Sequence, residues 1–177
     1  MTFRDLTPDD IEVRIQSVKQ NGLVLLLYKN ARVDMAILDE SVGAENWQRE
    51  HYECKGNLFC RVGIRVTTED GKSEWTWKSD CGTESNTEAQ KGEASDSFKR
   101  ACFNWGIGRC LYTAPFIWVP ASKCNINNGK CYDRFVVERI KIENKRITAL
   151  SIINTSLSAD KPSDRRAFLM MPKEDKA

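Results

Sequence analysis

The sequence is poor in the residues that build metal centres and acid–base sites. It has a single histidine, His51, and its seven cysteines include no CxxC pair, the close ligand spacing typical of zinc sites. The odd number of cysteines also argues against a disulfide framework. We therefore expect buried, reduced thiols and no bound metal.

The sequence also lacks long apolar runs and one-sided charge. Runs such as LVLLL (23–27) are far shorter than the roughly 20 residues of a membrane span, and the N-terminal MTFRDLTPDDIE is acidic rather than apolar. We expect no membrane segment, no secretion signal and a cytoplasmic location. With 27 basic and 25 acidic residues the net charge is only +2, so nucleic-acid binding depends on where the cations lie.

Motifs for catalysis are absent as well. GKS (71–73) is similar to the end of a phosphate-binding loop, but Val66 stands where the pattern GxxxxGK[ST] requires a glycine. His51 alternates with polar neighbours, which is typical of a surface imidazole rather than a general base. We expect a protein that is not an enzyme, with no catalytic residues and no cofactor. An enzyme whose catalytic residues are scattered along the chain stays an alternative.

Hydrophobic periodicity predicts the elements that are present. A period near 3.6 predicts helices at 7–20, 31–42 and about 87–105, and LVLLLY (23–28) is typical of a short strand. A period of two predicts three strands between Trp47 and Asp80, the last two joined by an Asp-Gly turn, and a hairpin over 132–153. The fold class is therefore α+β, with an N-terminal helix and a C-terminal hairpin beside a strand meander and a long helix. We expect residues 1–155 to form one domain and residues 156–177 a flexible charged tail.

The long predicted helix combines an apolar stripe with cations. Its buried stripe is predicted to contain Ala94, Phe98, Ala101, Cys102 and Trp105. Lys99 and Arg100 point about 100° apart on a helix, so only one can lie fully opposite the stripe. The other must lie at its border, where a groove between helix and sheet would form. Asp96, one turn earlier, could instead pair with these cations within the helix.

Nucleic-acid binding fits this pattern of cations and aromatic rings better than catalysis does. Trp75 and Trp77 share one strand face, where they could stack bases or pack in an interface. Solvated surface cations are the plain alternative, above all for Lys91. The candidate DNA contacts are on or just past the long helix (Lys91, Lys99, Arg100, Arg109), on one strand face (Arg61, Arg65) and at the start of the second helix (Arg32).

Two segments together resemble the Rad fifty-two family of single-strand annealing proteins, which includes the phage Sak-type recombinases. KGEASDSFKRACFNWGIGRCLY resembles the family signature of a lysine, small residues, an aspartate, a Lys-Arg pair and an aromatic-small-glycine end. NARVDMAILDESVGAENW resembles the family's preceding helix, which opens with an arginine. With the meander between them, the resemblance spans about residues 28–118.

The resemblance implies an antiparallel meander packed on a long helix (a β-β-β-α core), rings or helical filaments of identical subunits, and annealing of single-stranded DNA without ATP. By position, Arg32, Lys99 and Arg100 match residues that hold the DNA backbone, and Lys91 matches a further basic position. It also implies roles in homologous recombination and DNA repair. A phage origin, a bacterial host cytoplasm and a single-strand-binding protein as a further partner would fit. A protein that protects strands without annealing them, and a structural oligomer without a nucleic-acid role, are the alternatives.

Overall fold

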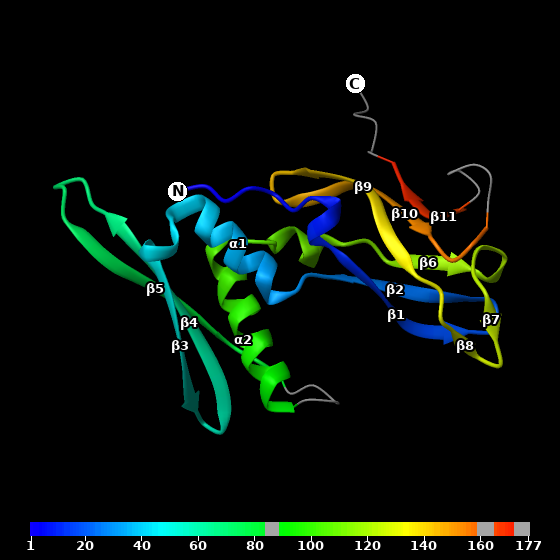
Figure 1. The fold of residues 1–177 in the computed structure, drawn as a ribbon, viewed down its shortest axis with the longest axis horizontal. Helices are drawn as coiled ribbons and strands as arrows, with labels where there is room; N and C mark the ends of the chain where they lie inside the picture. The colour runs from blue at the N-terminus through cyan, green and yellow to red at the C-terminus, as the bar shows by residue number, and fades with distance from the viewer. Residues whose placement is uncertain (84–88, 159–164, 172–177) are drawn as a thin grey trace. The chain divides into compact units, whose positions relative to one another are not determined.

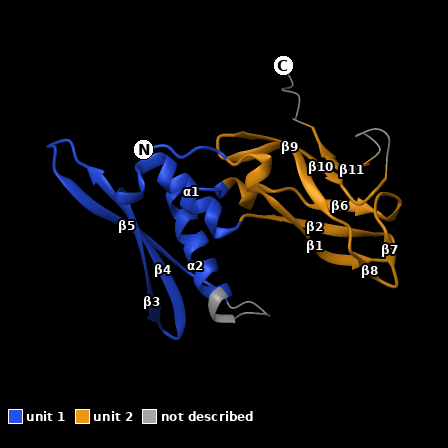
Figure 2. Ribbon diagram, in the orientation of Figure 1, with its two compact units in different colours: residues 1–5, 30–109 blue, residues 6–29, 110–177 orange. Residues whose placement is uncertain are grey.

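The structure, a computed structural model, describes residues 1–83, 89–158 and 165–171, with residues 89–91 described by their backbone alone. Where we expected one domain over residues 1–155, the chain divides into two compact units (Figure 2). Unit 1 comprises Met1–Asp5 and Asn30–Arg109, and unit 2 comprises Leu6–Lys29 and Cys110–Ala177. The chain thus leaves unit 1 early, forms a hairpin in unit 2 and returns.

Unit 1 contains a three-stranded antiparallel sheet (Figure 1). Its strands are β3 (Trp47–Cys54), β4 (Asn57–Thr67) and β5 (Ser73–Cys81), in that order. The three predicted strands are thereby confirmed, and so is the Asp-Gly turn, where Gly71 has φ +80°. A glycine takes this conformation without the steric penalty that a Cβ brings.

Two helices belong to the same unit. The helix α1 (Ala31–Val42) begins where the side chain of Asn30 accepts a hydrogen bond from the Arg32 N–H, at 2.9 Å, and it ends at Gly43. The helix α2 (Ala89–Trp105) follows β5 and packs against β4 and β5. It ends at Gly106, which has φ +97°, as the sequence predicted. The predicted capping residue Thr87 lies outside the described residues.

The core of unit 1 lies between this sheet and α2. Strand alternation turns Cys60, Val62 and Ile64 of β4 to one face, and all three are fully buried. Ile37 and Leu38 of α1 are also fully buried. The predicted apolar face of the middle strand is therefore confirmed, which leaves the Arg61–Arg65 face of β4 pointing away from the core.

Unit 2 is built on a six-stranded antiparallel sheet of order β11-β10-β9-β1-β2-β6. Its edge strands β11 and β6 contact each other, so the sheet curls towards closure. The predicted hairpin over 132–153 is confirmed, with Asn144 and Lys145 at φ 50° and 60° in its turn. The strands are β1 (Glu12–Lys19), β2 (Gly22–Tyr28), β6 (Ile117–Pro120), β9 (Phe135–Glu143), β10 (Arg146–Asn154) and β11 (Arg166–Met170), beside the small hairpin of β7 (Ile126–Asn127) and β8 (Lys130–Cys131).

The predicted helix at 7–20 is wrong. Only Pro8–Asp10 is helical, as one short 3-10 turn, and Glu12–Lys19 is strand β1. A β-bulge between Ile15 and Ser17 shifts the register of this strand by one residue. The bulge lets Ile15 and Val18, three residues apart, lie on the same face, and this spacing is what a helix would also produce.

The expectation of a flexible tail from residue 156 is also wrong for its apolar part. Residues Arg166–Met170 form the edge strand β11, which pairs with β10, and Ala167 is buried. The remaining tail, 159–164 and 172–177, lies outside the described residues. The described chain is thus a mixed α+β protein, mostly antiparallel sheet with two α-helices, and none of its described helices is long and apolar enough to cross a membrane.

Candidate nucleic-acid interface

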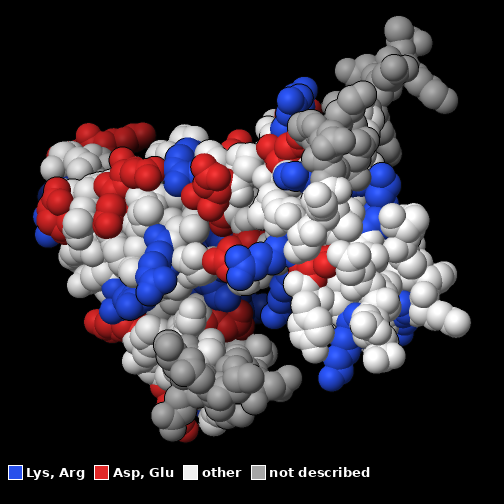
Figure 3. All heavy atoms as spheres, turned by 45° about the vertical axis from the view of Figure 1, so that its right-hand side comes forward, with Lys and Arg blue, Asp and Glu red and all other residues white. Residues whose placement is uncertain are grey.

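All seven cations that the sequence singled out lie in unit 1, but on four separate parts of it. Lys99 and Arg100 lie on α2, and Lys91 lies in its first turn, where only the backbone is described. Figure 3 shows basic side chains interspersed with acidic ones on the face in view, rather than one continuous basic surface. The others lie at the start of α1 (Arg32), on β4 (Arg61, Arg65) and just past α2 (Arg109).

Helix α2 is fixed on the sheet by the predicted stripe. Phe98, Ala101 and Cys102 are fully buried, and the Trp105 indole N–H donates to the Val62 carbonyl at 3.0 Å. The backbone at Gly82 lies so close to α2 that a Cβ there would come within 2.2 Å of the Glu93 carbonyl oxygen. The helix is therefore seated at close range, and its polar side chains have defined positions.

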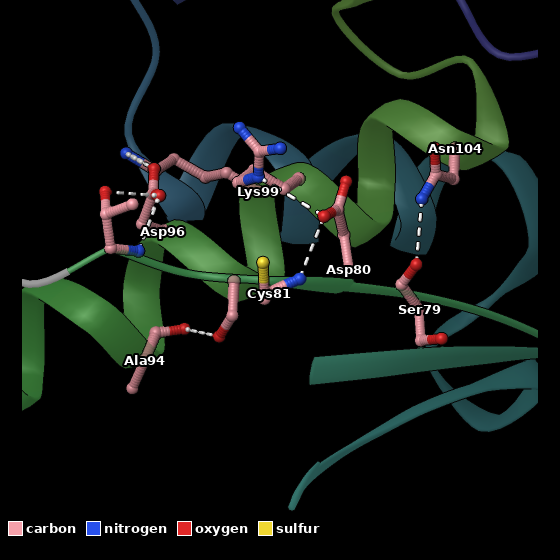
Figure 4. Close-up of polar contacts among 10 residues, drawn as sticks. Ser79, Asp80, Cys81, Ala94, Asp96, Lys99 and Asn104 are labelled. Atoms are coloured by element: carbon pink, nitrogen blue, oxygen red, sulfur yellow. Dashed lines mark hydrogen bonds and ion pairs between the residues drawn. The ribbon is translucent and has the colours of Figure 1, made fainter. Parts of the chain in front are cut away.

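Each of the two central cations has a carboxylate partner (Figure 4). The Lys99 Nζ lies 3.9 Å from Oδ1 of Asp96, one turn earlier on α2. The Arg100 Nε lies 3.4 Å from Oδ1 of Asp80, near the end of β5. Both side chains are partly buried, at 24% exposed for Lys99 and 38% for Arg100.

The carboxylates themselves are held by backbone donors. Asp96 accepts from the Thr83 N–H at 3.2 Å and from its hydroxyl at 3.3 Å, and Asp80 accepts from the Cys81 N–H at 2.8 Å. The two Thr83 bonds join the segment after β5 to α2, whereas the Cys81 bond lies within β5. The two cations are consequently positioned by the fold, although the four charges cancel. A phosphate has to compete with Asp80 and Asp96 for the same donors.

Arg32 and Arg109 sit in different surroundings. Arg32 is exposed in the first turn of α1, the helix that packs against α2. Arg109 donates from Nε and Nη2 to the Phe103 carbonyl, at 3.0 and 2.8 Å, and from Nη2 to the Asn104 carbonyl. These carbonyls belong to the last turn of α2, so Arg109 caps the negative end of the helix dipole. A contact of Arg109 with DNA stays a prediction.

Arg61 and Arg65 occupy the face of the sheet opposite α2. The Arg61 guanidinium donates to the Glu50 carboxylate and lies 4.5 Å from the centre of the Trp77 ring. Arg65 lies 5.2 Å from the centre of the Trp75 ring. The structure therefore separates these two arginines from Lys99 and Arg100 by the thickness of the sheet, and does not bring them into one groove.

Two further cations, which were not among the predicted contacts, lie on the helix-facing side of the sheet. The Lys78 Nζ donates to the Asn104 carbonyl at 2.9 Å and lies over the Trp105 ring, and the Arg49 guanidinium lies 4.7 Å from the centre of the Phe98 ring. The period-two pattern could have found them, because Arg49 and Lys78 pair across the sheet with Val62. His51, on the same face, lies 3.1 Å from the Ala94 carbonyl through its Nε2.

Comparison with known proteins identifies the family. A family model described as Rad52/22 family double-strand break repair protein matches residues 3–130, more than half of the chain. A search of curated proteins finds no match. The matched range contains all of unit 1 from residue 30 onward and every candidate cation, whereas β9, β10 and β11 lie beyond it. The chain belongs to the Rad52/22 family.

Proposed function

We propose that this member of the Rad52/22 family is an ATP-independent strand-annealing protein, which binds single-stranded DNA and pairs complementary strands during recombination and repair. The family match over residues 3–130 carries the proposal. Unit 1, with its meander followed by α2, is taken as the β-β-β-α core of the annealing domain. The protein is not an enzyme, and its work needs neither a nucleotide nor a metal.

Lys99 and Arg100 are the central phosphate contacts in this proposal, and Arg32, at the start of α1, is a further one. The buried stripe of α2 and the carboxylates of Asp80 and Asp96 hold the two cations at a fixed height above the sheet. Fixed cations lose little conformational freedom when a phosphate binds them, which favours binding. Because each phosphate contact releases counterions, the logarithm of the affinity for single strands should fall with the logarithm of salt concentration, with a slope of about −0.7 per contact.

Assembly of identical subunits completes the proposal. A ring or a helical filament would place many copies of this contact along one strand, so that weak contacts add up to high avidity. The phage Sak-type members are the expected relatives, and a host or phage single-strand-binding protein is the expected further partner, in the cytoplasm of a bacterial host.

An ATP-free annealing assay tests the function. Two complementary oligonucleotides carrying a donor and an acceptor dye are mixed with the protein in buffer that contains EDTA and no nucleotide. We expect the protein to accelerate duplex formation. Strands that are bound and protected from nuclease, but are not annealed faster, would indicate a protective single-strand-binding protein instead.

A further inference from the structure

The sheet of unit 1 has an outer face that α2 does not use. This face, called the outer sheet face below, is formed by alternate residues of the three strands, because side chains on a strand point to opposite sides in turn. The cross-strand pairs Tyr52–Phe59, Gly63–Trp77 and Arg65–Trp75 define it. Its aromatic and basic members are Tyr52, Phe59, Arg61, Arg65, Trp75 and Trp77.

The rings on this face form two close pairs. Tyr52 and Phe59 stack with ring centres 5.5 Å apart and an angle of 22° between their planes. Trp75 and Trp77 have ring centres 6.2 Å apart and are tilted by 34°, with the Arg65 guanidinium over the Trp75 ring and the Arg61 guanidinium over the Trp77 ring. Cations and rings therefore alternate along the sheet.

Gly63 allows this arrangement. A Cβ at this position would lie 2.8 Å from two atoms of the Trp77 indole, so the ring lies directly against the backbone of β4. The Arg61 guanidinium lies over the same ring, which is the cation–π arrangement that the face of an indole favours. Only glycine at position 63 leaves room for the Trp77 ring in this position.

The outer sheet face is open to solvent and carries net positive charge. Tyr52 is 38% exposed, the Arg61 side chain is 44% exposed, and Trp75 and Trp77 are half-buried. Its two arginines face one carboxylate, that of Glu50, which leaves a charge of about +1. The outer positions of β3, β4 and β5 that pair with these residues include no Leu, Ile, Val or Met. Rings and cations without aliphatic side chains suit a ligand that has flat rings and negative charges.

We infer that the outer sheet face is a second contact for single-stranded nucleic acid, in which bases stack on Trp75 and Trp77 and phosphates bind Arg61 and Arg65. The inference rests on the proposed function, which supplies single strands as the ligand. Stacking uses the π-face of a base and leaves its pairing edge free. A strand held in this way stays able to pair with its complement, while Lys99 and Arg100, on the other side of the sheet, contact phosphates alone.

A comparison of two ligands separates stacking from phosphate binding. One is a fluorescein-labelled dT oligonucleotide, and the other is the abasic strand of the same length, with the same phosphates and no bases. We expect the protein to prefer dT, and Trp75→Leu/Trp77→Leu to lose that preference by weakening dT binding roughly tenfold or more, since base–aromatic stacking contributes about 1–3 kcal/mol per base. Trp75→Phe/Trp77→Phe should keep most of the preference.

Control variants make the outcome specific. Phe116→Leu/Tyr132→Leu removes two of the most exposed rings, both in unit 2, and should leave both affinities unchanged. Lys99→Ala/Arg100→Ala should weaken dT and abasic binding by the same factor, because it removes phosphate contacts. Equal affinity of the unaltered protein for dT and abasic strands would overturn the inference. So would a tryptophan variant that keeps its preference for dT while its sedimentation shows a smaller assembly, since the face would then join subunits.

A crosslinking experiment needs no variant and does not depend on annealing. An oligonucleotide containing 5-iododeoxyuridine is bound to the unaltered protein, irradiated, digested with trypsin and mapped by mass spectrometry. We expect adducts on the peptide SEWTWK (73–78), which holds both tryptophans between Lys72 and Lys78. Adducts confined to other peptides would refute the stacking contact. If the protein does not accelerate annealing but this adduct forms, the proposed annealing function is wrong and the stacking contact is supported.

Discussion

Single residues of unit 1 show how a cation can be positioned without being free. Lys99 and Arg100 each lie beside a carboxylate that also accepts a hydrogen bond from a backbone N–H, that of Thr83 for Asp96 and that of Cys81 for Asp80. The carboxylates orient the cations and also reduce their attraction for phosphate. The binding strength of the site is therefore a balance that single charge changes can shift in either direction.

Replacing Asp96 by asparagine should tighten the binding of single-stranded DNA. The amide can still accept from Thr83, but the negative charge 3.9 Å from the Lys99 ammonium is lost. Because a partly exposed ion pair contributes up to about 1 kcal/mol, we expect the dissociation constant to fall about threefold at low salt, measured by fluorescence anisotropy. Glu143→Gln, which changes charge in unit 2, is the control. Weaker binding by Asp96→Asn would show that this carboxylate supports the site instead of opposing it.

The cysteines differ in reactivity according to burial. Burial raises the pKa of the Cys60 thiol to about 11, against the opposing effect of the Arg49 charge. At pH 8 this thiol is almost entirely protonated and inert, because the thiolate is the reactive form. Native protein treated with iodoacetamide at pH 8 should be alkylated at the exposed Cys54 first and at Cys60 only after unfolding, as read by mass spectrometry. Rapid alkylation of Cys60 in the native protein would contradict its burial.

Among the elements, β5 and α2 meet at close range where Gly82 follows β5. A methyl group at Gly82 would meet the backbone of α2 at the Glu93 carbonyl, 2.2 Å away. Since this neighbour is backbone, it cannot rotate aside. The position of α2, which carries Lys99 and Arg100, therefore depends on the glycine at position 82.

Gly82→Ala should destabilise unit 1 by about 2–3 kcal/mol, the cost of overpacking a close contact. Gly56→Ala is the matched control, because its Cβ would meet nothing within 4 Å and only its left-handed φ of +75° opposes the change. We expect Gly56→Ala to lower the unfolding free energy by about 1 kcal/mol. Urea denaturation followed by circular dichroism compares the two. Equal losses would mean that the contact at Gly82 relaxes without strain.

In unit 2, Asp133 ties the small β7–β8 hairpin to strand β10. Its carboxylate accepts from the Asn125 N–H at 2.7 Å, from the Asn125 amide at 3.0 Å and from the Asn154 amide at 2.7 Å. Burial raises the pKa of this carboxyl, but these hydrogen bonds together outweigh burial, so the pKa is lowered. The folded state consequently favours the charged form.

Asp133→Ala should cost about 2 kcal/mol of unfolding free energy at pH 7, since a buried amide loses its charged partner. A lowered pKa in the folded state stabilises the protein above the unfolded value of about 3.9, and this stabilisation disappears as pH falls through the folded value. The difference in unfolding free energy between the unaltered protein and Asp133→Ala should therefore be largest at pH 6–7 and decrease below about pH 4. A difference that stays constant down to pH 3 would refute this role for the charge.

At the scale of the whole molecule, the sequence predicted what is local. The meander β3–β4–β5, the helix α2 with its stop at Gly106, and the β9–β10 hairpin all follow from periodicity and turn residues close in sequence. The sheet of unit 2 depends on pairing between distant segments, such as Glu12 of β1 with Val136 of β9, which no local pattern encodes. The bulge in β1 puts Ile15 and Val18, three residues apart, on one face, and this spacing made the strand look helical.

The candidate site could be predicted only in part. Residue types on α2 and β4 indicated which cations to consider, and the alternation of β4 placed Arg61 and Arg65 on the face away from the core. The pairing of Arg100 with Asp80, twenty residues away on β5, and the capping role of Arg109 depend on how α2 is seated. Helical spacing did indicate the Asp96 contact of Lys99.

The most direct test of the account is the rate of ATP-free annealing by the unaltered protein beside Lys99→Ala/Arg100→Ala. The control, Lys130→Ala/Arg146→Ala, removes the same charge from exposed positions of unit 2. We predict that the unaltered protein and the control accelerate annealing equally, and that Lys99→Ala/Arg100→Ala is at least tenfold slower while it remains folded and assembled. A folded Lys99→Ala/Arg100→Ala protein that anneals at the unaltered rate would contradict the assignment of the site.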